Sequence, residues 1–531
     1  MKSKSYVGKW EFVIIRIDNK RSSSPVPDAD IQSGPHVPDT EPVPDAYYVA
    51  GGLIHGVDKA MRTSTLHFIL KVVTIAALTC AHAGAQDHNE FVFKHVNVLP
   101  MSKEAVLADY SVIVREGKVQ QMGPSSSVAI PQGAVEIDAK GKFMIPALSD
   151  MHVHLEGDAW NIMFPVASKF TSEEISFEDI LFLYVAHGIT TIEVMSAFPE
   201  HIALREKIRN NEMIGPRMIL SRMIDGAGKA WPPPISTWVN NADEAAKAVS
   251  AMHDQGYDRV KVYSFLDKAS YDTILATAKR LRMPVDGHIP LSTSVEYVLA
   301  SGQNMIAHPE EVMKFAKSYT PEQVGYFSGL IANSNTWVTS TLIIHRNLIA
   351  LLKDSAAEFS KPGTEYLHPM GLGVWSYIYT HLYKPIPPAA REKLVDGFNS
   401  FQKPLVYEFH KKGGKLLTGT DPLMPSTLPA ISLHLELEEL VNTGLTPYEA
   451  LRVSTTNTHE FLGELDRAGT IESGKDANLV LLDKNPLENI SNTRKIAGVM
   501  TQGRWISKEQ IESRLGQIRT SYAVLRLKKL Q

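Results

Sequence analysis

The chain has 531 residues, of which 44% are hydrophobic and 21% charged, enough for one large domain and a smaller one. Its formal net charge of -4 and its pI near 6.6 give no reason to expect nucleic acid or an acidic membrane surface as a partner. Small molecules are therefore the expected partners.

The first 85 residues do not resemble a folded domain. Residues 1–60 carry Pro, Ser and Asp clusters without a helical or strand period, and we interpret them as disordered or as a non-native extension. Residues 61–85 have a basic start, a short apolar run and a small-x-small end, which is typical of a signal peptide. The apolar run is too short for about 30 Å of hydrocarbon. We expect a periplasmic or secreted protein with no membrane association after cleavage.

The single cysteine lies inside this predicted signal peptide. Cleavage after Ala85 would remove Cys80, so the mature chain would have no disulfide and no thiol nucleophile. This excludes cysteine-based catalysis and zinc held by cysteine. A lipid anchor on Cys80 is disfavoured, because residues 77–79 match the usual small-residue pattern poorly.

Short β-rich runs occupy both ends of the mature chain. Runs of this kind lie at 91–93, 96–99, 111–114 and 119–122, and others follow at 477–482 and 496–500. We expect the two ends, 86–146 and 466–531, to pair into one small β-sandwich, with a tail at the C-terminus. The central unit, 147–465, would be an insertion within it.

In the central unit, apolar strands alternate with helical patterns, as they do in parallel sheets. The predicted strands are 143–148, 189–194, 217–220, 259–263, 284–288, 304–308, 337–343 and 415–421. Eight such strands favour an α/β fold of the (β/α)8 TIM-barrel type. The clearest helix is 271–281, with apolar residues on one face. Two irregular stretches, 229–240 and 359–388, are either lids over a substrate or ordinary surface packing.

Side chains that commonly bind metals fall at the carboxyl ends of five predicted strands. The six residues are His152, His154, Lys261, His288, His308 and Asp421. His152 and His154 are two residues apart on an extended segment, so both point to one side. A buried lysine such as Lys261 is costly unless it is paired or modified. Each residue alone could be structural, but strand ends of a barrel meet at one rim, so the set predicts a metal centre.

With these residues, the chain resembles the amidohydrolase superfamily, and within it the imidazolonepropionase-like group that includes metal-dependent Xaa-Pro dipeptidases. Amidohydrolases that hydrolyse ochratoxin are similar. The likeness covers nearly the whole mature chain. Besides the six residues, it rests on 137–148, 215–217, 469–471 and 474–477.

The resemblance implies a site with two divalent metal ions. His152, His154 and Asp421 would hold the first, His288 and His308 the second, and a carbamate formed on Lys261 would bridge them. True imidazolonepropionases lack the bridging lysine, so Lys261 favours the binuclear branch. Ala307, where many relatives carry Glu, removes no ligand. Zinc is the first expectation, although manganese, cobalt or iron would suit the same ligands.

The resemblance also implies a reaction, the cleavage of an amide bond by a hydroxide that bridges the two metals. Asp421 would serve as ligand and as base. Tyr263 lies two residues beyond Lys261 on the same side of its strand, and it could donate to the carbonyl oxygen or to a substrate carboxylate, or simply pack the barrel. His345, after the seventh strand, could contact substrate or merely begin a helix.

The expected substrate is a dipeptide or an N-acyl amino acid, with ochratoxin-type amides as a related possibility. Hydrolysis of a lactone or a cyclic amide on the same site is the alternative, because substrate choice lies in the loops. A different class is a non-catalytic binding protein on a hydrolase barrel, but such a protein typically loses ligands, and all six are present. A two-lobed periplasmic binding protein would need two open α/β domains. Similar barrel hydrolases often assemble, so a homo-oligomer is expected.

Overall fold

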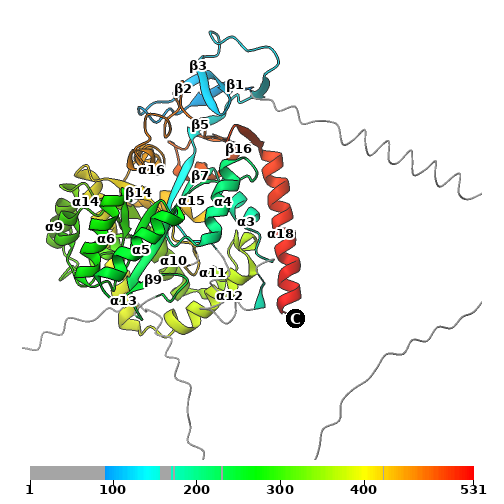
Figure 1. Cartoon of the computed structure of the whole chain (residues 1–531). Coiled ribbons are helices and arrows are strands. Elements are labelled where there is room, and N and C mark those ends of the chain that lie inside the picture. Colours follow the sequence, from blue (N-terminus) through cyan, green and yellow to red (C-terminus); the bar gives the residue numbers. More distant parts are fainter. Residues whose placement is uncertain (1–89, 156–168, 172–173, 229–230, 423, 531) are drawn as a thin grey trace, which may run out of the picture. The chain divides into compact units, whose positions relative to one another are not determined.

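Two β-sheets organise the part of the chain that the computed structural model describes (Figure 1). That part comprises residues 90–155, 169–171, 174–228, 231–422 and 424–530. The expectations for 1–60 and for the signal peptide at 61–85 lie outside it. Within these ranges, no helix has the length and apolar character needed to cross a membrane.

The larger sheet is a parallel barrel, as the sequence predicted. Its strands follow one another in chain order: β6 (Leu148–Val153), β7 (Ile189–Val194), β8 (Arg217–Gly226), β10 (Arg259–Val262), β11 (Val285–Gly287), β12 (Met305–Ala307), β13 (Trp337–Ser340) and β14 (Leu416–Thr418). A short further strand, β9 (Thr237–Val239), pairs with the end of β8. The first and last strands meet where the Asp421 amide donates to the His152 carbonyl at 2.7 Å and the Thr418 hydroxyl donates to the Ser149 carbonyl at 2.8 Å.

Helices connect these strands. They are α3 (Phe177–Ala186), α4 (Pro199–Arg209), α5 (Ala242–Gln255), α6 (Lys268–Leu281), α7 (Val295–Ser301), α8 (Pro309–Met313), α9 (Pro321–Ala332), α10 (Leu342–Lys353), α11 (Ser355–Phe359), α12 (Pro369–Ile378), α13 (Pro388–Asp396) and α14 (Lys403–Lys411), followed by α15 (Ile431–Thr443), α16 (Pro447–Ser454) and α17 (Thr456–Phe461). Local chemistry sets their ends. The Asp267 side chain accepts from the Ser270 amide at the start of α6, and Gly256 ends α5 at φ 86°. The buried face of α6 includes Ile274 and Ala278 from the predicted apolar stripe.

Both ends of the described chain join in the second sheet. It contains β1 (Glu90–Val98), β2 (Leu107–Arg115), β3 (Lys118–Pro124), β4 (Val135–Asp138), β5 (Phe143–Pro146), β15 (Leu479–Leu482), β16 (Ile496–Thr501) and β17 (Arg504–Ser507). The ends meet where β15 pairs antiparallel with β5. Phe93, Met144 and Leu481 belong to its own apolar core. A barrel inserted between the two parts of a separate sheet is confirmed, and the C-terminal tail is a helix, α18 (Lys508–Leu530).

The prediction for the first barrel strand is wrong. Strand β5 pairs with β1 and β15 in the second sheet, and the first barrel strand is Leu148–Val153. The true first strand has polar residues in its interior, since Ser149, Asp150 and His152 are at most 1% exposed. Its sequence therefore lacks the apolar pattern by which a buried strand is recognised. The seventh strand also ends earlier than predicted, at Ser340, since α10 begins at Leu342.

The two irregular stretches differ from each other. Most of 359–388 is helical, since α12 continues into a π-helical turn, Tyr379–Tyr383, and Trp375 of α12 is fully buried. This stretch is therefore packed structure over much of its length. Within 231–240, Thr237–Val239 forms β9, and the preceding residues reach the rim of the barrel, as described below.

Candidate metal centre

The predicted ligands lie at the carboxyl ends of the barrel strands, as expected. His152 is the last but one residue of β6 and His154 follows that strand, while Lys261 lies near the end of β10. His288, His308 and Asp421 follow β11, β12 and β14. The structure therefore brings all of them to one rim.

Three of these side chains form a compact group. The His154 Nε2 lies 3.1 Å from Asp421 Oδ1, and the His152 Nε2 lies 3.8 Å from the same oxygen. One ligand atom from each residue lies within 4.8 Å of the other two. Two imidazole nitrogens and a carboxylate oxygen at this spacing fit one divalent ion.

Lys261 and His308 complete this side of the site. The Lys261 Nζ lies 3.3 Å from His152 Nε2, and the His308 Nε2 lies 3.8 Å from the second carboxylate oxygen of Asp421. The rings of His152 and His308 are 4.5 Å apart. Asp421 therefore faces histidines with both of its oxygens.

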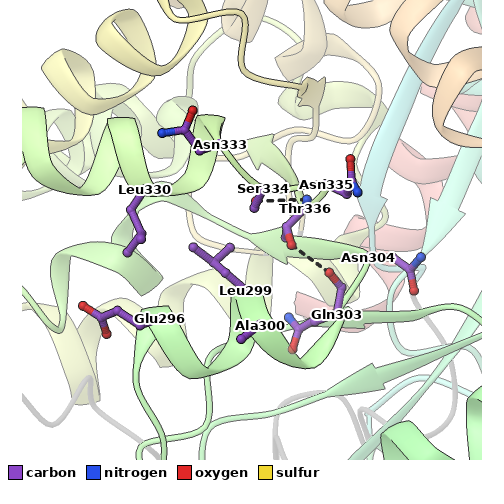
Figure 2. Close-up of a pocket in the computed structure, with 11 residues that line it drawn as sticks. Glu296, Leu299, Ala300, Gln303, Asn304, Leu330, Asn333, Ser334, Asn335 and Thr336 are labelled. Atoms are coloured by element: carbon purple, nitrogen blue, oxygen red, sulfur yellow. Dashed lines mark hydrogen bonds between the residues drawn. The ribbon is translucent and has the colours of Figure 1, made fainter.

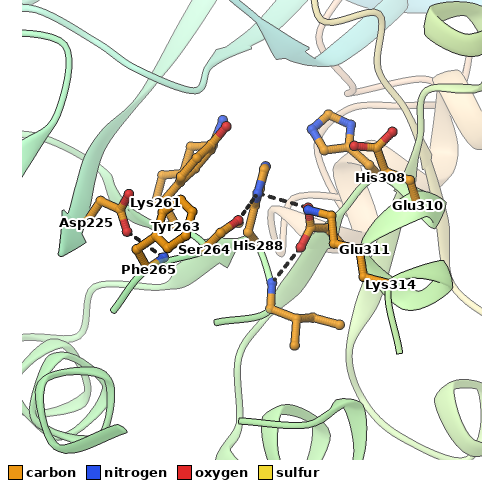
Figure 3. Close-up of polar contacts among 12 residues, drawn as sticks. Asp225, Lys261, Tyr263, Ser264, Phe265, His288, His308, Glu310, Glu311 and Lys314 are labelled. Atoms are coloured by element: carbon orange, nitrogen blue, oxygen red, sulfur yellow. Dashed lines mark hydrogen bonds and ion pairs between the residues drawn. The ribbon is translucent and has the colours of Figure 1, made fainter. Parts of the chain in front are cut away.

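His288 is oriented by a residue that the sequence did not reveal. Its Nδ1 lies 2.9 Å from Glu311 Oε1 and 3.0 Å from the Ser264 hydroxyl (Figure 3). Glu311 is fully buried, accepts from the Ile289 amide at 3.2 Å and is paired with Lys314. Since Nδ1 is occupied, Nε2 is the atom that His288 could offer to a metal, the usual arrangement of a metal-binding histidine held by a carboxylate.

Burial keeps the histidines in the form that binds metal. It lowers the pKa of His152 and His308 well below the usual value, and lowers the pKa of His288 to about 4, so their rings are neutral at pH 7. Burial lowers the pKa of Lys261 to about 8. Burial alone would raise the pKa of Asp421, but the hydrogen bond from His154 and neighbouring positive charges hold it at about 2. These neutral nitrogens and this carboxylate fit divalent cations.

The backbone around the site is held in an unusual conformation. His308 and Asp421 have φ values of 74° and 50°, where residues other than glycine are uncommon. Fully buried Asp150 fixes the second of these segments, because it accepts from the Thr420 amide at 3.0 Å and from the Thr420 hydroxyl at 2.5 Å. His308 Nδ1 lies 2.8 Å from the Thr341 hydroxyl. Such strain is often found at functional sites.

Beneath the site, charged residues are paired across the barrel interior. The guanidinium of Arg259 donates to both oxygens of Asp286, at 3.0 Å for Nη2 to Oδ1, and its Nε lies 3.6 Å from Glu193. Asp286 and Glu193 are fully buried. Asp286 is next to Gly287 and His288 in sequence, but it serves this pairing and is no part of the ligand group.

Tyr263 and His345 were left open between a functional and a structural role. The Tyr263 ring stacks on His288 with centroids 4.0 Å apart, and its hydroxyl lies 3.0 Å from the Trp231 indole nitrogen, so it borders the site. His345 lies inside α10, where its Nε2 is 3.2 Å from Glu310. Its side chain is 4% exposed, which favours the structural role.

A cavity of about 530 Å³ lies away from this rim (Figure 2). It is lined at the starts of β12 and β13, by Gln303, Asn304 and Thr336 among others, and the Thr336 hydroxyl donates to the Gln303 carbonyl at 3.0 Å. His308 lies at the opposite end of β12. Chemistry in parallel barrels occurs at the carboxyl ends of the strands, so this cavity is not the candidate site.

Comparison with known proteins relates the sequence to a known enzyme family. Residues 143–506 match the Amidohydrolase family. An imidazolonepropionase of Geobacillus kaustophilus is 23% identical over 424 residues, which is 72% of this chain and 86% of that protein. A 5-methylthioadenosine/S-adenosylhomocysteine deaminase of Symbiobacterium thermophilum is 24% identical over 408 residues, which is 73% of this chain and 83% of that protein.

Solved structures share the fold. A putative prolidase from Bifidobacterium longum matches with a TM-score of 0.58 and 20% identity over 81% of this chain and 99% of its own. The A. niger ochratoxinase matches with a TM-score of 0.59 and 16% identity over 79% of this chain and 96% of its own. Because the family match extends over more than half of the chain, the chain belongs to the amidohydrolase family and is a metal-dependent hydrolase of carbon-nitrogen bonds.

Proposed function

We propose that this amidohydrolase is a periplasmic or secreted enzyme with two metal ions that cleaves the amide bond of a dipeptide or an N-acyl amino acid. The observation that carries the proposal is the meeting of His152, His154, Lys261 and Asp421 at the rim, with His288 and His308 beside them. A mononuclear site would leave Lys261, which is only 2% exposed and lies beside His152, without a role.

The ligand assignment follows from the contacts. His152, His154 and Asp421 would hold one ion, and His288 and His308 the other, since the His288 and His308 rings are 5.3 Å apart. Lys261, as a carbamate, would carry two oxygens and one negative charge, which suits a position between two cations. Two divalent ions, when bound, lower the pKa of water and polarise a carbonyl group.

The chain's own residues would move the protons. Asp421 stays ionised at neutral pH and faces histidines with both oxygens, so it can accept a proton from the attacking water and pass it to the leaving amine. Tyr263 would donate a hydrogen bond from its hydroxyl to the carbonyl oxygen as negative charge develops there. Its ring borders His288, and the side chain is only partly buried.

The substrate class is supported by likeness in fold. The solved structures with this fold include proteins named prolidase, Xaa-Pro dipeptidase and ochratoxinase, all of them under 25% identical to this chain. A dipeptide or an N-acyl amino acid is the substrate that these names favour, and ochratoxin-type amides are a variant of it. Zinc is the first candidate metal, and a homo-oligomer is the expected assembly.

The test is a substrate panel with a matched pair of variants. Wild type, Asp421→Asn and the control Asp466→Asn would be assayed on dipeptides, N-acyl amino acids, cyclic amides and lactones. Asp466 is exposed on the surface and far in sequence from the ligands. We expect amide hydrolysis that Asp421→Asn abolishes and Asp466→Asn preserves. Hydrolysis of lactones or cyclic amides alone would support the alternative reaction, and no hydrolysis at all would favour a binding protein.

Location needs a separate measurement. N-terminal sequencing of the protein recovered from its native compartment should give Gln86 as the first residue. A protein that begins at or before Met61 would contradict both the signal peptide and the secreted location.

A further inference from the structure

Trp231 reaches the candidate site from the segment that follows β8. Its indole nitrogen lies 3.0 Å from the hydroxyl oxygen of Tyr263. Indole can donate a hydrogen bond but cannot accept one through this nitrogen, whereas a phenol can do both. Trp231 is therefore the donor, Tyr263 is the acceptor, and the proton of the phenol must point elsewhere.

The remaining contacts of Tyr263 leave that proton available. Its ring is stacked on His288, with planes 27° apart, which fixes the ring beside the ligand group. In the described part of the chain, no acceptor receives a hydrogen bond from the Tyr263 hydroxyl.

Trp231 is itself held in place by its own segment. Its carbonyl accepts from the Trp238 indole at 2.7 Å and from the Ser236 hydroxyl at 2.6 Å. The next residues are tied to the barrel, because the Arg222 guanidinium donates to the Pro234 carbonyl at 2.5 Å and the Ser196 hydroxyl donates to the Ile235 carbonyl at 2.7 Å. The indole therefore lies in a fixed position relative to β7 and β8.

We propose that Trp231 is a positioning residue for the hydrolytic reaction, which occupies the phenol oxygen of Tyr263 and so directs the phenol proton toward the carbonyl oxygen of the substrate. This inference rests on the proposed function, in which Tyr263 donates to that oxygen. The stretch 231–240 would then help to arrange the site, in addition to any role as a lid over the substrate.

A purely packing role for Trp231 predicts something different. The indole is partly buried against the main apolar core, so its loss could disturb the rim without any involvement of the hydroxyl. In that case the damage would be the same whether or not Tyr263 has its hydroxyl. If Trp231 acts through the hydroxyl, removal of the hydroxyl removes the effect.

A double-mutant cycle separates these two possibilities. The full chain would be prepared as wild type, Trp231→Phe, Tyr263→Phe and the double variant, with Trp505→Phe of the second sheet as a control that also loses one indole. For each, kcat and KM on the best amide substrate, bound metal and melting temperature would be measured.

We expect Trp231→Phe to lower kcat by about 3-fold to 10-fold, the usual range for loss of one neutral hydrogen bond, with little change in KM. Tyr263→Phe should lower kcat by about 100-fold or more. The double variant should equal Tyr263→Phe, and the control should equal wild type. Bound metal should be the same throughout.

Equal reductions of kcat by Trp231→Phe in both backgrounds would overturn the inference and leave the proposed function standing. An unchanged kcat in Trp231→Phe would do the same. A wild type that hydrolyses no amide would instead refute the proposed function, and the inference would fall with it.

Discussion

Removal of the Glu311 carboxylate should weaken both metal binding and folding. Glu311 is fully buried, and its oxygens contact His288 Nδ1 at 2.9 Å and the Ile289 amide at 3.2 Å, besides the ion pair with Lys314. Removing one partner of such a buried pair costs about 3–5 kcal/mol of stability. Loss of a carboxylate that orients a metal-binding histidine typically lowers metal affinity by about 10-fold to 100-fold, which is about 1.4–2.8 kcal/mol.

The assay uses Glu311→Ala, with Glu311→Gln as a milder change and the exposed Glu322→Gln of α9 as the control. Melting temperature is measured on metal-free protein, and metal affinity by competition with a coloured chelator. We expect Glu311→Ala to lower both the melting temperature and the metal affinity. Glu311→Gln should lower them less, and the control should match wild type. Burial alone would raise the pKa of Glu311, but contacts with His288 and Lys314 lower it below its ordinary value. The contribution of Glu311 to stability is therefore full above about pH 4.5 and declines in acid. Wild-type metal affinity in Glu311→Ala would refute the account of how His288 is oriented.

Three further substitutions test how the barrel supports the candidate site. Gly287 has φ 126°, and a Cβ there would lie 2.2 Å from the Val262 carbonyl oxygen, so Gly287→Ala should lower the melting temperature and the metal affinity. The control Gly325→Ala, on the open surface of a helix, should be neutral or slightly stabilising. Equal effects of the two substitutions would contradict this prediction. The folded pKa of Lys261 is lowered to about 8, so between about pH 8 and pH 10.5 the unfolded chain binds more protons and metal-free protein should become more stable as pH rises. Metal-free Lys261→Met should lack this increase in stability with pH. Thermal melts of wild type and variant at pH 7 and pH 9.5 measure it, and an equal increase in both proteins would contradict the prediction. Arg259→Ala leaves two buried carboxylates without their cation and should cost about 3–5 kcal/mol, seen as a lower denaturation midpoint; an unchanged midpoint would mean that the pairing contributes little.

The barrel could be predicted because most of its strands are short apolar runs separated by helical patterns. The same rule placed β5 in the barrel, since Phe143–Pro146 is apolar while the true first strand carries buried Ser149 and Asp150. A buried polar strand is stabilised by contacts such as that between Asp150 and Thr420, which are 270 residues apart, and no local pattern reveals them.

The meeting of the six candidate ligands could be predicted from strand ends, because a barrel brings those ends to one rim. Their role as ligands stays a prediction. Glu311 and Trp231 were not foreseen, because each contacts a residue far away in the sequence. Glu311 contacts His288, 23 positions earlier, and Trp231 contacts Tyr263, 32 positions later. A carboxylate shortly after His308 was visible in the sequence, but nothing there indicates that it turns back toward His288.

We propose that the six residues form a centre for two metal ions on which hydrolysis depends. The most direct measurement is bound metal per chain, determined by mass spectrometry on purified wild type and Lys261→Ala together with their amide hydrolysis. We expect about two ions per chain in the active wild type, and loss of metal and of activity in the variant. A metal-free wild type that is active, or a Lys261→Ala variant with full metal content and activity, would contradict it.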